Sequence, residues 1–286
     1  MEEEKGYSVA SLCKQGEVSR AAYYKWLNRK ESPNDKLNKI IAEKVEAIHA
    51  EHPDMGYRRL RDTLEHDENI DVNDKRVLRI CRKKNIQSIV KGKHNCCTKP
   101  ASDPAYVAEN ILNREFKAEH PNEKWVTDVS AFKYGVGTEN VGKIYLSAII
   151  DLCDKRPVSY VISDHNDNPL VFDTFDAAIA ANPDAHPLFH SDRGYQYTSN
   201  DFRQRIIKAD MTQSMSRVAR CIDNGPMEGF WGLMKREMYY TRKYQTKEEL
   251  MKAINNYIDY YTNRRIQRKL GVLTPMEYHE QMLLAA

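Results

Sequence analysis

Three acidic residues, Asp128, Asp192 and Glu228, lie within or beside predicted secondary structure in the second half of the 286-residue chain. There are 63 residues between Asp128 and Asp192, and 35 between Asp192 and Glu228. Mg²⁺ prefers carboxylate oxygens, and a pair of such ions can activate an attacking oxygen and stabilise a leaving one at a phosphate. Each residue alone also has a structural explanation, as a strand residue paired with a lysine, a turn residue or a helix cap. Their chemistry depends on whether the fold brings them together.

The elements that must position these residues begin after Pro121, where the sequence pattern changes. Alternating and β-rich runs predict strands, and longer runs with helical spacing predict helices. In chain order these are strand 125–132, strand 143–152, strand 158–162, helix 169–181, strand 186–190, helix 201–208, strand 212–215, helix 226–240 and helix 247–262. Such an order predicts an α/β fold of mixed α+β type, in which helices flank a five-stranded mixed sheet.

Three motifs carry a resemblance to a known family. They are Trp125-x-Thr127-Asp128, the run HSDRGYQYTS over 190–199 and the run DNGPMEGF over 223–230. With the 35-residue gap, and with Lys235 seven positions after Glu228, they resemble the catalytic core of DDE transposases and retroviral-type integrases, above all the orfB-type transposases of bacterial insertion sequences. The resemblance covers nearly the whole chain, since VSRAAYYKW at 18–26, GYRRL at 56–60 and the segment 263–278 are similar to the ends of that family.

The resemblance implies a ribonuclease H-like core with Asp128 on the central strand, Asp192 after an adjacent strand and Glu228 on a helix that crosses them. These three residues are then the catalytic and metal-binding residues, holding two Mg²⁺ ions, for which Mn²⁺ can substitute; no other cofactor is expected. Water attacks a DNA strand first, and the freed 3′-hydroxyl then attacks target DNA. Lys235 is expected to reach a DNA phosphate. Asp151 and Asn224 are expected to have supporting roles at most, Asn224 by holding the loop before the glutamate or by contacting DNA.

The resemblance also implies partners. These are double-stranded DNA, both as the terminal inverted repeats of the element and as the target, and further copies of the chain in an oligomer on DNA. An upstream-frame product, to which such chains are often fused by ribosomal frameshifting, is a further expected partner.

The N-terminal third is expected to bind DNA. Formal net charge is only +3, but nine Lys and Arg residues and no Asp or Glu fall between Lys75 and Lys99, a pattern that indicates a polyanionic partner. Short helical runs there predict a helix-turn-helix-like segment at 1–31 and a three-helix DNA-binding domain at 36–91, followed by a linker at 92–118 and the catalytic core at 119–281. The predicted DNA-binding residues are Lys235, Arg79, Arg82, Lys83, Lys84, Arg58, Arg59, Arg264 and Arg265. A solvated basic helix face and an all-helical adaptor for another protein are the alternatives at this stage.

Composition excludes several classes of protein. Hydrophobic residues make up 41% and charged residues 30% of the chain, and the longest apolar run, near 145–150, is far shorter than the ~20 residues of a membrane span. The acidic start MEEEKG is unlike a signal peptide, so a soluble, intracellular protein without a membrane partner is expected. The resemblance further implies a bacterial, nucleoid-associated protein of the cytoplasm. Two alternatives to the transposase remain: a catalytically inert DNA-binding repressor derived from one, and a ribonuclease H-type nuclease that acts on RNA–DNA hybrids.

Overall fold

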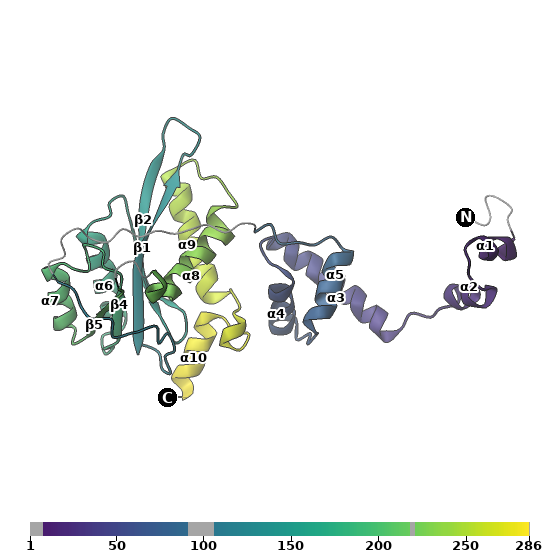
Figure 1. Cartoon of the computed structure of the whole chain (residues 1–286), viewed down its shortest axis with the longest axis horizontal. Coiled ribbons are helices and arrows are strands. Elements are labelled where there is room, and N and C mark those ends of the chain that lie inside the picture. Colours follow the sequence, from purple (N-terminus) through teal and green to yellow (C-terminus); the bar gives the residue numbers. More distant parts are fainter. Residues whose placement is uncertain (1–7, 91–105, 218–220, 286) are drawn as a thin grey trace.

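The computed structural model describes residues 8–90, 106–217 and 221–285 (Figure 1). At one end of the elongated molecule lie the two short helices α1 (Val9–Gln15) and α2 (Arg20–Leu27), and the sheet-containing part lies at the other end. The serines before these helices, Ser8 and Ser19, accept hydrogen bonds from backbone N–H groups of the first turn, which is how such residues start a helix.

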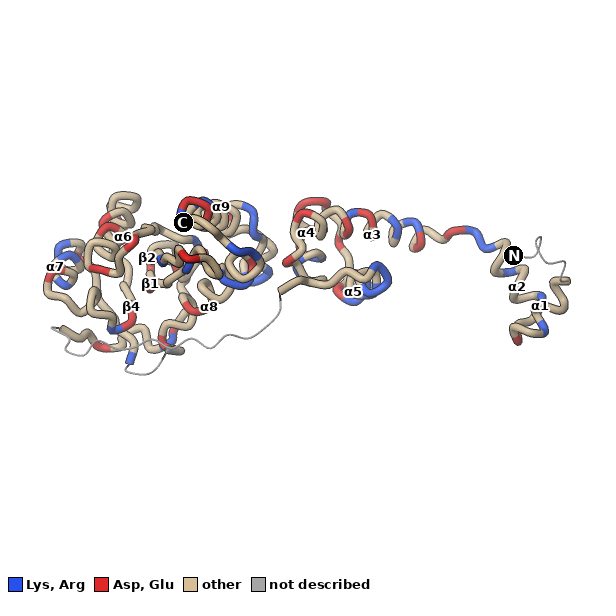
Figure 2. Tube along the Cα trace, turned by 90° about the horizontal axis from the view of Figure 1, so that it is seen from above, with Lys and Arg blue, Asp and Glu red and all other residues tan. Residues whose placement is uncertain are grey.

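A three-helix unit lies between these two ends. It consists of α3 (Pro33–Glu51), α4 (Tyr57–Glu68) and α5 (Asp74–Lys83). Each helix turns apolar residues spaced by three or four positions toward the others, because helical residues at that spacing share a face. The fully buried members of this core are Ile41, Val45, Leu60, Leu64 and Val77. The basic residues of α5 lie on its other side, where Figure 2 shows Lys and Arg gathered along the helix.

The sheet has five strands in the order β3-β2-β1-β4-β5. β1 pairs antiparallel with β2, and β2 pairs antiparallel with β3, whereas β4 is parallel to both β1 and β5. The strands span β1 Lys124–Tyr134, β2 Gly142–Asp151, β3 Pro157–Ser163, β4 Leu188–Ser191 and β5 Thr212–Met215. This is the mixed ribonuclease H-like sheet that the sequence predicted, so the α/β fold class is confirmed.

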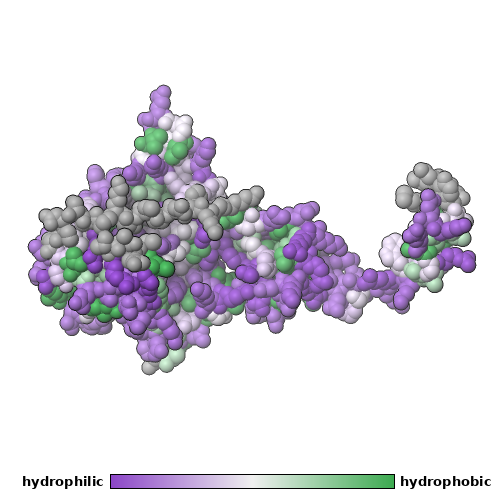
Figure 3. All heavy atoms as spheres, viewed as in Figure 1, coloured by the Kyte–Doolittle hydropathy of each residue, from purple (hydrophilic) through white to green (hydrophobic). Residues whose placement is uncertain are grey.

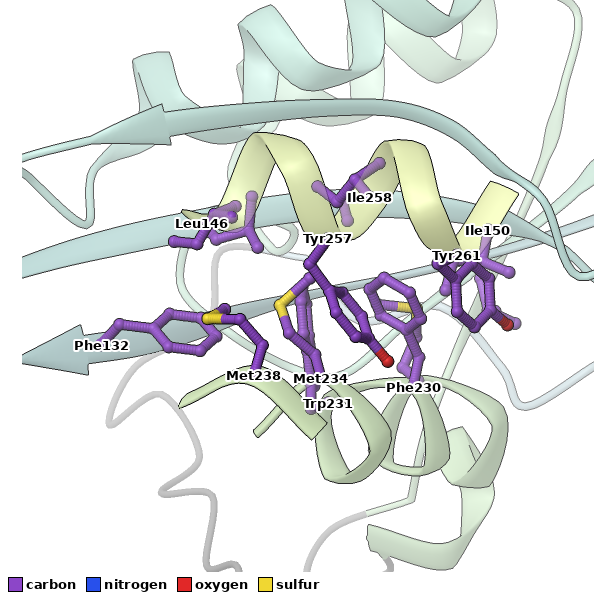
Figure 4. Packing of buried hydrophobic residues seen from close by; sticks show 14 of the residues in the cluster. Phe132, Leu146, Ile150, Phe230, Trp231, Met234, Met238, Tyr257, Ile258 and Tyr261 are labelled. Atoms are coloured by element: carbon purple, nitrogen blue, oxygen red, sulfur yellow. The ribbon is translucent and has the colours of Figure 1, made fainter. Parts of the chain in front are cut away.

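Helices cover both faces of the sheet. α6 (Asn168–Ala181) and α7 (Asn200–Lys208) pack on one face against a cluster that includes Trp125, Phe175, Phe189 and Phe202. α8 (Gly225–Met234) and α9 (Lys247–Asn263) pack on the other face, where aromatic, methionine and aliphatic side chains fill the layer (Figure 4). Because successive strand residues point to opposite faces, Val126 and Phe132 on β1 face α8 and α9, and so does Asp128.

Three parts of the chain differ from the sequence prediction. The helix expected over 226–240 changes at Met234 into a π-helical turn, η2 (Lys235–Tyr239), and α10 (Pro275–Ala285) was not predicted. In the segment expected as a linker, residues 106–118 lie on the sheet-containing part, where Leu112 is buried and Tyr106 N donates to Thr198 O at 3.0 Å. The remaining linker residues up to 105 lie outside the described ranges, and the domain boundaries stay predictions.

The β1–β2 hairpin projects beyond the other strands (Figure 1). Val136 and Val141 near its tip are exposed, and Figure 3 shows apolar surface on this projection. Gly135 turns the chain with φ of +65°, where a Cβ would meet Asn140 O at 2.1 Å. Across the described ranges, no helix is both long enough and apolar enough to cross a membrane.

Candidate active site on the central strand

Asp128 lies in the middle of β1, the central strand, opposite Ala148 of β2. Its side chain is half-buried beneath α8, and the indole Nε1 of Trp231 donates to its Oδ2 at 3.0 Å. The strand fixes the backbone and the indole fixes the side chain. The first carboxylate is therefore held in place before any metal or DNA binds.

Asp192 lies just after β4, the parallel neighbour of β1. The N–H of Gly194 donates to Asp192 Oδ1 at 2.8 Å, which folds the loop back on the carboxylate. On β4, the buried ring of His190 hydrogen-bonds through Nδ1 to Ser214 Oγ at 2.8 Å and through Nε2 to Ser216 Oγ at 3.1 Å. Burial lowers the pKa of His190 to about 4, so the neutral ring locks β4 to β5 and fixes the start of the Asp192 loop.

The two aspartates influence each other electrostatically. Burial, reinforced by the charge of Asp192, raises the pKa of Asp128 to about 7. Burial also raises the pKa of Asp192 above its ordinary value. The hydrogen bond from Trp231 and the charge of Lys235 act in the opposite direction on the pKa of Asp128. Two partly desolvated carboxyl groups that repel each other form a place where a cation would be stabilised.

Glu228 is on α8, and two side chains from that end of the chain reach β1. Asn224, just before α8, donates from Nδ2 to Thr127 O at 2.9 Å, and Trp231 bonds Asp128 as described. In the sequence, Glu228 lies between Asn224 and Trp231. It precedes Trp231 by three residues, a spacing that places Glu228 and Trp231 on the same face of the helix. Asn224 thus holds the loop before the glutamate, one of the two roles predicted for it.

The structure brings two of the three predicted carboxylates together and places the third on the helix above them. Within residues 8–90, 106–217 and 221–285, no three His, Cys, Asp or Glu side chains are grouped closely enough to hold a metal ion. Glu228 is half-buried in the first turn of α8. The grouping of all three residues therefore stays a prediction.

Lys235 follows α8 at the first position of η2, four residues beyond Trp231. Its Nζ lies over the ring of Phe132, 5.3 Å from the centroid, and its charge is close enough to favour the ionised form of Asp128. A lysine held beside the aspartates is placed for contact with a phosphate that approaches them.

Two other acidic residues support the fold. Asp223 is fully buried and accepts from Arg217 Nε at 2.8 Å and Arg114 Nε at 2.7 Å, which ties the segment before β1 to the chain entering α8. Asp151, predicted at most as a support of the site, is opposite Trp125 at the end of β2. Its oxygens accept from the backbone N–H groups of Asn122 and Cys153, so it organises the loop after β2.

Comparisons with known proteins match most of the chain. The integrase core domain family matches residues 118–221, a second integrase core family matches 228–283, and an HTH-like domain family matches 36–94. InsK of insertion sequence element IS150 from Escherichia coli K12 is 35% identical over 276 residues, which cover 96% of this chain and 94% of that protein. The chain belongs to the orfB-type transposases of bacterial insertion sequences.

Other relatives of this transposase are similar over most of its length. An uncharacterized transposase-like protein of Haemophilus influenzae is 36% identical over 76% of this chain and 97% of its own length. Among solved structures, the HTLV-2 integrase catalytic core domain in complex with magnesium is 18% identical, with a TM-score of 0.43, over 56% of this chain and 97% of that one.

Besides Lys235, the predicted DNA-binding residues of the transposase fall into two groups. The first group consists of four exposed basic residues on α5 and just after it, Arg79, Arg82, Lys83 and Lys84. Of these, Lys84 has an acidic neighbour, since its Nζ lies 3.1 Å from Glu46 Oε1. The other residues form two adjacent pairs. In the first pair, Arg58 is exposed, whereas Arg59 bonds Glu237. In the second pair, the side chain of Arg264 is 67% exposed, whereas that of Arg265 is 9% exposed and also bonds Glu237. Contact with DNA stays a prediction for all of them.

Three residues with clear functions in this site were missed from the sequence. Trp231, His190 and Glu237 hold Asp128, the Asp192 loop and the turn after α8, respectively. Only Trp231 gives a usable signal, because its position three residues after Glu228 places an N–H donor on the same helix face.

Proposed function

We propose that this chain is a Mg²⁺-dependent DDE transposase that binds the terminal inverted repeats of its own insertion sequence, cleaves a strand and joins the 3′ end to target DNA. The observation that carries the proposal is the convergence at β1. Asp128 and Asp192 interact there through charge, and the helix with Glu228 is anchored to the same strand by Asn224 and Trp231.

The residues fit divalent metal ions. The carboxylate oxygens of Asp128 and Asp192 are the hard donors that Mg²⁺ prefers, and a bound cation would offset the repulsion that Asp192 exerts on ionised Asp128. Asp128 and Asp192 would hold the metal, and Glu228 would join them from α8. When bound, two such ions supply the charge that stabilises the five-coordinate phosphorus and activates the attacking oxygen.

The protein residues act mainly by placement. In cleavage, a water oxygen attacks the phosphorus at the element end, the bond to the 3′ oxygen breaks, and that oxygen leaves as a hydroxyl. In joining, the 3′ oxygen attacks a target phosphorus, and the target 3′ oxygen leaves and takes up a proton. Lys235 contacts a non-bridging phosphate oxygen beside the aspartates, and Trp231 keeps Asp128 in one orientation.

The N-terminal parts would hold the DNA. The exposed basic residues of α5 contact phosphates, and the HTH-like domain family match at 36–94 supports this role. A complex on two element ends requires several copies of the chain. An upstream-frame product would act with them.

A substrate comparison tests the proposal. Terminal-repeat DNA taken from the genomic sequence that flanks the gene, scrambled DNA and an RNA–DNA hybrid are each incubated with the full chain and Mg²⁺, and cleaved and joined products are measured. Cleavage and joining of the terminal-repeat DNA alone is the expected result. Binding without any cleavage would favour the inert repressor, and cleavage of the hybrid would favour the ribonuclease H-type nuclease.

A further inference from the structure

Glu237 lies in η2, the turn that continues the catalytic helix beyond Lys235, and its carboxylate collects hydrogen bonds from distant parts of the chain. Arg265 donates to it from Nε at 2.9 Å and from Nη2 at 2.7 Å, and Tyr257 OH donates at 2.9 Å. Arg59, from the three-helix unit, donates from Nη1 to Oε1 at 3.1 Å. Burial opposes ionisation, but these bonds and the arginine charges outweigh it and hold the pKa of Glu237 below its ordinary value.

Arg59 has two further partners, Asp54 within the three-helix unit and Tyr260 on α9. Its guanidinium donates to Asp54 Oδ2 at 2.6 Å and to Tyr260 OH at 2.6 Å. The ring of Tyr260 in turn stacks on that of His52, with centroids 5.4 Å apart. A planar donor group with several partners in place is more rigid than a surface ion pair, so Arg59 joins the two parts at a defined position.

A second set of contacts holds the same two parts together. Arg268, just after α9, donates to Asp62 Oδ1 at 2.6 Å and to Asp74 Oδ1 at 3.0 Å. His66 Nε2 lies 3.0 Å from Glu277 Oε2. Removal of Arg59 alone would therefore leave the three-helix unit docked, while Glu237, Asp54 and Tyr260 would each lose one hydrogen bond.

We propose that Arg59 is a positioning residue that couples the docked three-helix unit to the catalytic helix through Glu237. This inference rests on the proposed function. Glu237 is two residues after Lys235, and a single helical path leads from it to Glu228. A π-helical turn at that point has a different backbone hydrogen-bond pattern from the helix before it, and such turns often occur at functional sites. The bond from Arg59 sets that turn, and with it the positions of Lys235 and Glu228 over the two aspartates.

The chain offers a matched control. Arg58 and Arg59 are adjacent and carry the same charge, but Arg58 is exposed and lies over the ring of Tyr57, 5.6 Å from its centroid. If both arginines only contact DNA phosphates, substitution of the exposed Arg58 should have the larger effect on DNA binding. Coupling through Glu237 predicts an effect for Arg59 that is independent of DNA affinity.

The first measurement compares full-length Arg59→Gln and Arg58→Gln on terminal-repeat DNA. Arg59→Gln leaves Glu237 paired with Arg265, so the fold should persist. We expect its cleavage rate at saturating DNA to fall ~10-fold while its Kd for the DNA stays within ~2-fold of wild type. The saturated rate of Arg58→Gln should fall less than that of Arg59→Gln, and Arg59→Lys should recover part of the loss. A wild-type saturated rate for Arg59→Gln would overturn the proposal.

The second measurement needs no activity. Hydrogen exchange of the backbone amides of 235–239 should be faster in Arg59→Gln than in Arg58→Gln, because the turn is then held by fewer hydrogen bonds. Unchanged exchange in Arg59→Gln would overturn the coupling. If Arg59→Gln exchanges faster but the wild-type protein cleaves no DNA, the proposed function is contradicted, whereas the coupling between Arg59 and the turn is supported.

Discussion

The indole N–H of Trp231 donates to Asp128 Oδ2 at 3.0 Å, and this bond ties the helix that carries Glu228 to the central strand of the sheet. The ring of Trp231 is itself buried in the layer between α8, α9 and the sheet (Figure 4). A core residue therefore fixes the orientation of a carboxylate that is half-exposed at the site.

Replacement of this tryptophan should shift the pH dependence of catalysis. The bond from Trp231 favours ionised Asp128, so Trp231→Phe should raise the pKa of Asp128 further and move the acid limb of the cleavage rate to higher pH. The phenyl ring keeps the apolar packing. The measurement is the cleavage rate from pH 6 to pH 9 beside wild type, and identical profiles would show that the bond has no effect on Asp128.

The raised pKa of Asp128 also predicts how stability depends on pH. The folded protein holds this proton up to pH of about 7, whereas the unfolded chain releases it near 3.8, so stability should fall as pH rises between these values and then level off. A pKa difference of one unit between the folded and unfolded states corresponds to about 1.4 kcal/mol of stability. Because Asp128 keeps partial contact with water, we expect a total loss of stability from this group of about 2 kcal/mol. Asp128→Asn should make this fall smaller, whereas the contributions of Asp151 and Asp154, whose pKa values burial raises to about 6, should remain.

The measurement is urea unfolding without divalent ions at pH 5 and pH 8. Asp184→Asn, a change at an exposed aspartate, is the control and should behave as wild type. An Asp128→Asn protein that loses stability with pH as steeply as wild type would contradict the prediction.

A comparison of Lys235 with its neighbour Arg236 tests whether Lys235 contacts DNA at the site or only adds positive charge to the surface. Lys235→Ala should reduce joining ~10-fold, which corresponds to a transition-state interaction of ~1.4 kcal/mol, while stability changes by at most about 1 kcal/mol. Arg236 is exposed, so Arg236→Ala should join at nearly the wild-type rate. Equal rates for the two alanine variants would remove Lys235 from the site.

The exposed basic residues of α5 should contribute to DNA affinity through phosphates. Replacing Arg79, Arg82 and Lys83 with alanine should weaken binding to all DNA sequences and reduce the slope of log K against log salt by ~0.9 for each phosphate that is no longer neutralised. Arg76 serves as a contrast, because its guanidinium bonds Asn38 Oδ1 at 2.8 Å within the unit. A salt slope equal to wild type would mean that α5 does not face DNA.

The sequence predicted the sheet, with Asp128 on its first strand, Asp192 after a short strand and Glu228 on a helix, because the longer strands and helices have strong periodicity. It did not predict which arginine of each adjacent pair is buried. Arg58 and Arg59, like Arg264 and Arg265, have the same local pattern, and their difference arises from Glu237, which is distant in sequence. Side-chain partners of this kind depend on tertiary packing. The change from α-helix to π-helical turn at Lys235 depends on tertiary packing as well.

Cleavage of terminal-repeat DNA by single carboxylate variants tests the central claim most directly. Asp128→Asn, Asp192→Asn and Glu228→Gln should each abolish Mg²⁺-dependent strand cleavage and joining, while binding to the element ends stays close to wild type because the N-terminal units hold the DNA. All three variants should give no product above a metal-free control. Near-wild-type cleavage by any one of them would contradict the assignment of that residue to the site.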